Sequence, residues 1–424
     1  MQTVAESGST DSWSWQKQAP LYLLYLGLLL ITFLTQAPIT YEQGLGWDGV
    51  TYGQVARQIH AGEPIVADAP FCHRLGTPWL ASYLLDYMPL TRAFLLVNLL
   101  PILLFPFLFI RFWRRYEMAS GAAWIFILIF VLSWHVSPRF NFYYPVTPDP
   151  WLWLFVLLTL PELSRPRQGW LRYPLLIFVG VLFRELVLWI ALAGAVGRAL
   201  SIVPVRWRVD RELRRHLIAL LVGIAALMLT HLMATGTGEY GLLRAVIGGF
   251  WHKPFPIWVN GWFAAFGILL ITALSSWNWL RGWVKCYPQE TVWMIGLWIL
   301  GWCAGTDTVR IVFWSMPVAF LMLYHHYRQY SGFYRRWWVL GLILVVHVLS
   351  QRWGTPIPDH DPAAVSQFPL FAPQGVHCPY LDLEPQYAPH WVSKISLMQY
   401  LAASFALVVG FWRWNRKQGE VGSK

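Results

Sequence analysis

Charged residues are scarce in this chain of 424 residues and make up only 12% of it. Apolar residues make up 57%, a share above that of soluble domains. Many apolar runs approach the roughly 20 residues that a membrane-spanning helix needs. These runs are continuous rather than alternating, so they favour helices over the strands of a membrane barrel. The composition therefore predicts an all-α, polytopic membrane protein and argues against a soluble domain.

Cysteine is also scarce. The four residues Cys72, Cys286, Cys303 and Cys378 include no pair with the spacing of a metal-binding motif. Cys72 and Cys378 both fall in loops expected outside the cytoplasm, where oxidising conditions would allow them to pair. The polar segment 1–19 lacks the pattern of a signal peptide, which favours a retained first helix.

Basic residues outnumber acidic residues by 32 to 21, so the formal net charge is +11. In a membrane protein such an excess belongs to cytoplasmic loops, and it does not indicate a nucleic-acid partner. The basic clusters predict cytoplasmic segments at residues 111–115, 165–172, 206–215, 328–336 and 413–424. Both termini are then expected in the cytoplasm.

This orientation predicts about twelve spanning helices in a single integral-membrane domain over residues 1–424. Residues 1–19 and 413–424 are expected as cytoplasmic tails. The expected outer segments are the first outer loop 38–74, the segments 137–150 and 235–256, and the Pro-rich loop 351–390. No internal repeat and no second, soluble domain is evident in the sequence.

The run 173–203 is ambiguous because arginine-rich loops bound it on both sides. Its ends would share the cytoplasmic side, so the run must cross an even number of times. We expect a hairpin of two short helices with Arg184 and Glu185 at the outward tip. The alternative is one long helix with an internal ion pair.

The first outer loop holds a polar stretch at residues 46–78 between two apolar segments. An amphipathic helix is expected to begin at Asp48 and to stop at Gly62-Glu63-Pro64. It would lie on the membrane surface as a short interfacial helix. Asp48 then lies at the N-terminus of this helix, either as a functional carboxylate or simply as the helix N-cap.

Ionisable residues from distant parts of the chain are expected on this outer face: Asp48, Arg57, His73, Arg74, Arg139, Asp149, Arg184, Glu185, His252, Lys253, Asp307 and Arg310. Charged groups near a bilayer are costly and usually face a cavity or a partner. A cavity with a carboxylate and several cations suits an anionic ligand, because arginine binds phosphate oxygens in a bidentate way. The carboxylate can act as a general base.

Several of these residues also have ordinary structural explanations. Asp149, between two prolines, can cap the helix that follows it. His252 and Lys253 can belong to a solvated loop at the membrane interface. Asp307 and Arg310 can form a local pair three residues apart on a helix.

The order of four short motifs resembles that of bacterial GT-C-type integral-membrane glycosyltransferases. The motifs are Trp-Asp-Gly-x-x-Tyr at 47–52, Pro-Phe-x-x-Arg-x-x-x-Pro at 70–78, Arg184-Glu185, and the run 305–310 followed by Pro317. The resemblance implies a polyprenyl-phosphate-linked sugar as donor, membrane lipid as a partner, and Asp48 as the catalytic base. The residues expected to bind donor or acceptor are Tyr52, His73, Arg74, Asp149, Arg184, Glu185, His252, Lys253, Asp307 and Arg310.

Asp48 lacks the second acidic neighbour that many members of this superfamily carry, so neither a metal nor another cofactor is expected. The resemblance implies an inverting transferase that acts on the periplasmic or exterior side of a bacterial inner membrane. The alternative is a transporter or flippase of an anionic lipid or sugar, which usually has internal repeats and charges near the midplane. A scaffold without activity is a third hypothesis that no motif favours.

Overall fold

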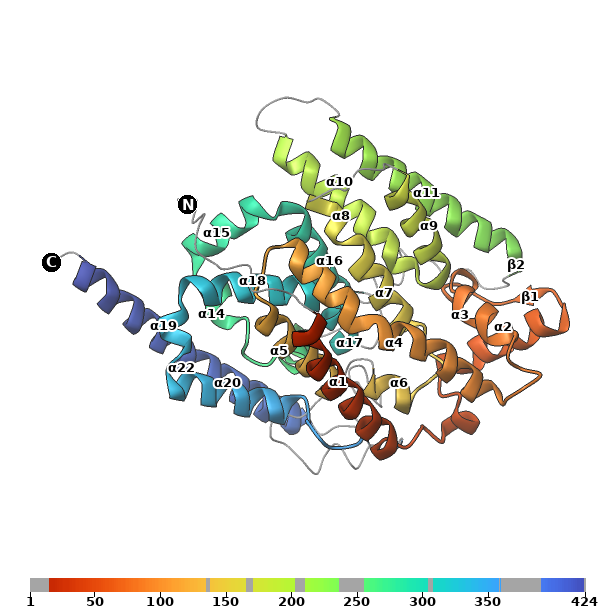
Figure 1. Ribbon diagram of the computed structural model, residues 1–424, viewed down its shortest axis with the longest axis horizontal. Helices are drawn as coiled ribbons and strands as arrows, with labels where there is room; N and C mark the ends of the chain where they lie inside the picture. The colour runs from red at the N-terminus through yellow and green to blue at the C-terminus, as the bar shows by residue number, and fades with distance from the viewer. Residues whose placement is uncertain are drawn as a thin grey trace. The chain divides into compact units, whose positions relative to one another are not determined.

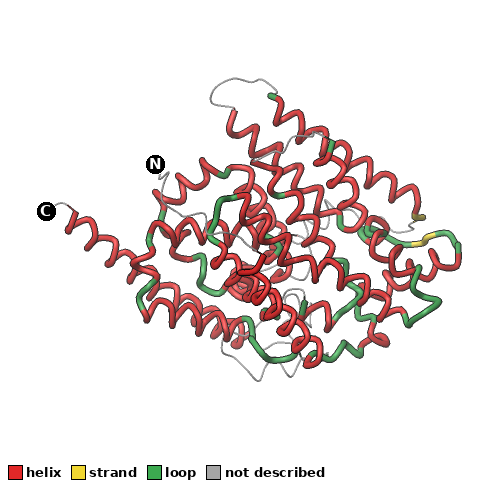
Figure 2. Tube along the Cα trace, in the orientation of Figure 1, coloured by secondary structure: helices red, strands yellow, loops and turns green. Residues whose placement is uncertain are grey.

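The computed structural model describes residues 15–134, 138–164, 171–202, 210–235, 255–303, 308–357, 359 and 390–422. Helices account for most of these residues, and the connections between them are short (Figure 2). Among the described residues the only strands are β1 (Ile65–Val66) and β2 (Ala234–Thr235), which pair in parallel. The all-α class predicted from composition is therefore confirmed.

The chain divides into two compact units. The first comprises residues 1–132, 136–242 and 287–296, and the second comprises residues 133–135, 243–286 and 297–424. Among the described residues, the first unit carries three helices long and apolar enough to cross a membrane, and the second carries one. The expectation of one integral-membrane domain stays a prediction.

The first unit contains the first outer loop and the helices around it. Its described elements are α1 (Trp15–Thr35), η1 (Tyr41–Gly44), α2 (Asp48–Ala61), β1, η2 (Phe71–His73), α3 (Gly76–Ser82), α4 (Leu90–Arg115), α5 (Ser120–Leu132), α6 (Arg139–Tyr143), α7 (Asp149–Thr159), α8 (Pro161–Ser164), α9 (Arg172–Phe183), η3 (Glu185–Val187), α10 (Leu188–Ile202), α11 (Arg211–Met233) and β2.

Helix α2 begins and ends where the sequence predicted. It ends at Gly62, whose φ of 68° places it in the left-handed region that glycine adopts without a steric penalty. The N-cap residue of α2 is Trp47, and no side chain caps the helix there. Asp48 is the first residue inside the helix. The N-cap explanation of Asp48 is therefore wrong.

The run 173–203 is a hairpin, as the basic flanks predicted. Arg184 has an extended backbone, with φ −155° and ψ 120°, and this breaks the run between α9 and η3. Both α9 and α10 pack against α11 (Figure 1). Near the start of α9, Tyr173 contacts His216 in the first turns of α11. Near the end of α10, Arg198 pairs with Asp210, the N-cap of α11. The two helices therefore run in opposite directions, and the alternative of one long helix is wrong.

The second unit contains α13 (Phe255–Phe266), α14 (Ile271–Ser275), α15 (Trp277–Cys286), α17 (Thr308–Phe313), α18 (Met316–Gln329), α19 (Ser331–Tyr334), α20 (Trp337–Ser350) and α22 (His390–Gly422). Helix α16 (Pro288–Cys303) contributes residues to both units. Buried His326 has a structural role: its Nε2 lies 2.9 Å from Ser276 Oγ and its Nδ1 lies 2.8 Å from the Tyr334 hydroxyl.

Four of the described helices are long and apolar enough to span a membrane: Gln18–Thr35, Leu90–Arg115, Arg211–Met233 and Lys394–Gln418. Shorter apolar helices occur at Ser120–Leu132, Arg172–Phe183 and Trp337–Ser350. The expected count of twelve spanning helices is not confirmed. Part of the reason is that two long apolar runs of the sequence are broken. The run 257–280 breaks at Gly267, which has a φ of 56°, and the run 311–325 breaks between α17 and α18.

Candidate functional site

Two side chains from distant parts of the sequence, Glu185 and Tyr52, meet Arg74 in the first unit. The guanidinium donates from Nε to Glu185 Oε2 at 2.7 Å and from Nη2 to Glu185 Oε1, so the pair is bidentate. It also donates from Nη1 to the Tyr52 hydroxyl at 2.8 Å. Arg74 and Tyr52 are both buried. Charge-assisted, bidentate bonds are the strongest class of hydrogen bond in proteins, so Glu185 fixes the orientation of Arg74.

A second ion pair lies beside the first. Arg184 Nη1 is 3.0 Å from Asp149 Oδ1, and only 6% and 4% of the two side chains are exposed. Asp149 is the first residue of α7, and the N-cap Pro148 provides no side-chain cap. The capping explanation of Asp149 is therefore wrong, because the carboxylate serves as the partner of Arg184.

Close packing at the hairpin tip holds the two ion pairs in place. Phe183, the last residue of α9, stacks on Trp151 of α7 with ring centroids 4.3 Å apart. Phe183 also packs against Gly76 at the start of α3, where an added Cβ would lie 2.7 Å from the Phe183 ring. The absence of a side chain at Gly76 lets this ring approach. Arg184 and Glu185 then follow directly in the chain, beside Asp149 and Arg74.

Asp48 lies at the solvent-exposed edge of this group. It is one helical turn before Tyr52 on α2, and its charge acts on the Tyr52 hydroxyl. The turn that precedes it is held by Tyr144, whose hydroxyl accepts a 2.6 Å hydrogen bond from the Gly49 amide. An added Cβ at Gly46, where φ is +64°, would lie 2.5 Å from the Tyr144 ring. Asp48 is therefore an exposed carboxylate on a fixed turn.

The electrostatics of the site follow from these contacts. Burial alone would raise the pKa of Glu185, but the Arg74 guanidinium opposes it and lowers the pKa to about 2. Burial alone would lower the pKa of Arg74, yet Glu185 and Tyr52 raise it well above its ordinary value. Burial raises the pKa of the Tyr52 hydroxyl. Glu185 is therefore an anion and Tyr52 a neutral hydroxyl at neutral pH.

His73 lies next to this network but has other partners. Its Nδ1 is 3.2 Å from the Thr230 hydroxyl on α11, and its ring centroid is 6.1 Å from that of His231. The sequence placed His73 among the donor-binding residues, whereas its hydrogen bond connects the first outer loop to α11. We refer to the end of the first unit that carries Asp48, His73, the two ion pairs and His231 as the site end.

The other predicted site residues do not join this group in the described part of the chain. His252, Lys253 and Asp307 lie outside the described residues, so the proposed pair of Asp307 with Arg310 lies outside them too. Arg310 belongs to α17 in the second unit. Cys72 is a buried, free thiol, so it does not form the suggested disulfide. Its suggested partner Cys378 lies outside the described residues.

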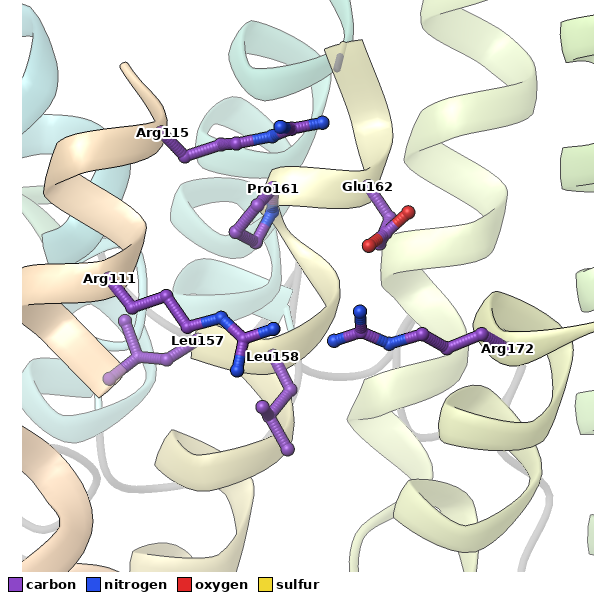
Figure 3. A pocket seen from close by; sticks show the side chains of 7 residues that line it. All are labelled: Arg111, Arg115, Leu157, Leu158, Pro161, Glu162 and Arg172. Carbon is purple, nitrogen blue, oxygen red and sulfur yellow. The ribbon is translucent and has the colours of Figure 1, made fainter. Parts of the chain in front are cut away.

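A second charged group lies at the opposite end of the same helices. Arg111, Arg115 and Arg172 point toward one small hollow, together with Glu162 (Figure 3). The Glu162 carboxylate is paired with Arg215 at 2.6 Å. Basic clusters from separate loops are thus gathered at one end, which we call the basic end. This is the arrangement expected if those loops share one side of a membrane.

Arg139 is a residue whose role the sequence did not predict. It begins α6 and is only 2% exposed, and among the described residues no hydrogen bond reaches its Nε or Nη1. Burial lowers its pKa, and no carboxylate of the described residues opposes this shift. A buried cation without an acidic partner is costly. The sequence shows that Arg139 lies in a polar segment between two apolar runs. That position does not predict that its side chain is buried.

Comparison with known proteins assigns no family to the chain. No family model matches it, and no curated protein matches its sequence.

Proposed function

We propose that this protein is a polytopic membrane glycosyltransferase of the GT-C type, which transfers a sugar from a polyprenyl-phosphate-type donor to an acceptor hydroxyl. The observation that carries the proposal is the meeting of four separate segments at the site end. Exposed Asp48 lies there with Tyr52, and behind them lie the Arg74–Glu185 and Arg184–Asp149 pairs. The four motifs that resemble this superfamily supply three of those segments.

The proposed reaction divides the work between Asp48 and the arginines. Asp48 takes the proton of the acceptor hydroxyl, and the acceptor oxygen attacks the anomeric carbon from the face opposite the phosphate. A carbon–oxygen bond forms, and the bond between the anomeric carbon and the phosphate oxygen breaks. The leaving lipid phosphate keeps the electron pair. The anomeric configuration is inverted.

Arg74 is suited to neutralise this leaving group. A guanidinium has five N–H donors, and three of them are used on Glu185 and Tyr52. One hydrogen therefore remains on each Nη, and the two can bind phosphate oxygens while Glu185 keeps the group oriented. Glu185 and Tyr52 are then positioning residues rather than catalytic ones.

The membrane orientation is part of the proposal. The basic end, with Arg111, Arg115 and Arg172, would face the cytoplasm, and the site end would face the periplasm or exterior of a bacterial inner membrane. Both termini would then be cytoplasmic. Transport of an anionic lipid is less well supported, since the ion pairs of the site end lie at helix termini and the sequence has no evident repeat.

The test is a transfer assay on the purified full chain in detergent, with a panel of polyprenyl-phosphate-linked sugars and lipid or glycan acceptors. We expect Asp48→Asn to abolish transfer and to melt at the wild-type temperature. Glu63→Gln, which neutralises another exposed carboxylate of the same outer loop, is the matched control and should keep full activity. Wild-type turnover by Asp48→Asn would exclude this mechanism, and movement of labelled lipid without transfer would favour the flippase alternative.

A further inference from the structure

Three potential metal ligands lie together where the first outer loop meets the end of α11. They are Cys72, His73 and His231, and one ligand atom from each lies within 4.8 Å of the other two. Cys72 is buried, His73 is partly buried and His231 is exposed. We propose that they bind a divalent transition-metal ion of the zinc class, with one thiolate, two imidazoles and a solvent molecule as ligands. This inference does not depend on the proposed transferase activity.

The two segments that supply the ligands are held together by contacts that do not involve the ligands. β1 and β2 pair in parallel, with Ile65 opposite Ala234 and Val66 opposite Thr235. The Thr235 hydroxyl also donates to the Ile65 carbonyl at 3.1 Å. Cys72 and Ala234 belong to one buried apolar cluster that includes residues from both segments. The ligands are therefore brought together by the fold before any ion binds.

A hydrogen-bond chain favours one tautomer of His73. The Thr230 hydroxyl has one hydrogen, and it donates this hydrogen to the Leu227 carbonyl at 2.8 Å. With its hydrogen used there, the same oxygen accepts from His73 Nδ1, which lies 3.2 Å away, in the tautomer that carries its hydrogen on Nδ1. His73 Nε2 therefore carries the free lone pair. Metal-binding histidines usually have their other ring nitrogen oriented by an outer partner in this way.

The spacing of the two imidazoles is close to that of ligands on one ion. Zinc–nitrogen bonds of about 2.0–2.1 Å place the centroids of two imidazoles roughly 5 Å apart on a tetrahedral ion. Here the centroids of His73 and His231 are 6.1 Å apart. The His231 side chain is exposed, so it can move the roughly 1 Å closer to His73 that this geometry requires.

The donor set decides which metals fit. A thiolate with two imidazoles suits zinc, cobalt, nickel or copper, whereas magnesium and calcium require oxygen ligands. Binding converts the Cys72 thiol to a thiolate and releases its proton to solvent. The sequence predicted no metal because Asp48 has no second acidic residue beside it. That prediction concerned a metal at Asp48, and Asp48 is not one of the three ligands proposed here. Three protein ligands leave a fourth position open to water on the exposed side of His231.

The test is a cobalt titration of the detergent-purified full chain after treatment with a chelator. We expect one equivalent of Co²⁺ to give a thiolate-to-cobalt charge-transfer band and the visible bands of a tetrahedral site, and Zn²⁺ to displace it. Cys72→Ser should lose the charge-transfer band. His231→Ala should weaken Co²⁺ binding by at least about 10-fold, and Thr230→Val by about 10-fold through the lost outer partner.

Cys286→Ser is the matched control, because Cys286 is an exposed thiol on α15 and should leave the titration unchanged. His231→Ala removes an exposed side chain, so it tests the site even if Cys72→Ser fails to fold. The proposal is overturned if wild-type protein gives no charge-transfer band, or if His231→Ala binds Co²⁺ as tightly as wild type. The readout is spectroscopic, so it stays informative if no sugar transfer is found.

Discussion

Arg74 and Glu185 are 111 residues apart in the chain and form a bidentate ion pair at the site end. The pair ties the first outer loop to the tip of the α9–α10 hairpin, and Tyr52 of α2 joins it through Arg74. A single guanidinium thus connects three elements that carry the motifs of the sequence.

Removing either partner of this pair should destabilise the protein. Arg74→Ala leaves the Glu185 carboxylate without its partner, and we expect a loss of about 3 kcal/mol of unfolding free energy, at the lower end of the range for a buried pair. The measurement is denaturant unfolding in detergent. Combining Arg74→Ala with Glu185→Gln should cost less than the sum of the single changes. Additive losses would show that the two residues do not interact in solution.

Arg184→Ala should affect stability more than the sequence suggested. The sequence placed Arg184 among the residues expected to bind donor or acceptor, but Arg184 is buried against Asp149. Its removal leaves an uncompensated buried carboxylate, which costs about 3–5 kcal/mol. The matched control is Arg198→Ala, whose pairs with Asp210 and Glu212 are about one third exposed, so a loss of about 1 kcal/mol or less is expected. Equal losses in the two variants would contradict the buried pair.

The Arg74–Glu185 pair should make stability depend on acid pH. The pKa of Glu185 is lowered from 4.5 to about 2 in the folded protein. A lowered carboxyl pKa contributes stability that is fully present above pH 4.5 and is lost as the pH falls toward 2. The melting temperature of wild type should therefore exceed that of Glu185→Gln at neutral pH, and the gap should close across this window. A gap that is constant with pH would rule out this contribution.

Arg139→Met should raise the melting temperature of the protein in the absence of donor. The substitution replaces a buried cation that has no carboxylate neighbour among the described residues with an apolar side chain of similar length. We expect a gain of about 1–3 kcal/mol, because an unsatisfied buried polar group costs at least that much. Arg57→Met, at an exposed position of α2, is the control and should leave the melting temperature unchanged. A large loss of stability in Arg139→Met would mean that the guanidinium has a structural partner.

Local features of the chain were predictable because they depend on near neighbours. The apolar composition predicted helices, Gly62 predicted the end of α2, and the arginines on both sides of 173–203 predicted a hairpin with Arg184 and Glu185 at its tip. Each of these follows from backbone preference or from the cost of placing charge in lipid. The breaks at Gly267 and after α17 were missed because the flanking residues are as apolar as a continuous span.

Only the tertiary structure decided which charges pair. The sequence grouped Arg74, Arg184, Asp149 and Glu185 on one side of a membrane but did not distinguish among their possible pairings. In the structure Phe183 packs against Gly76 and Trp151 at the hairpin tip, Arg74 pairs with Glu185, and Arg184 pairs with Asp149. The sequence also did not predict that Cys72 and His73 lie close to His231. Contacts between residues that are more than a hundred positions apart in the sequence depend on how the helices pack. No local sequence pattern predicts which of these residues come together.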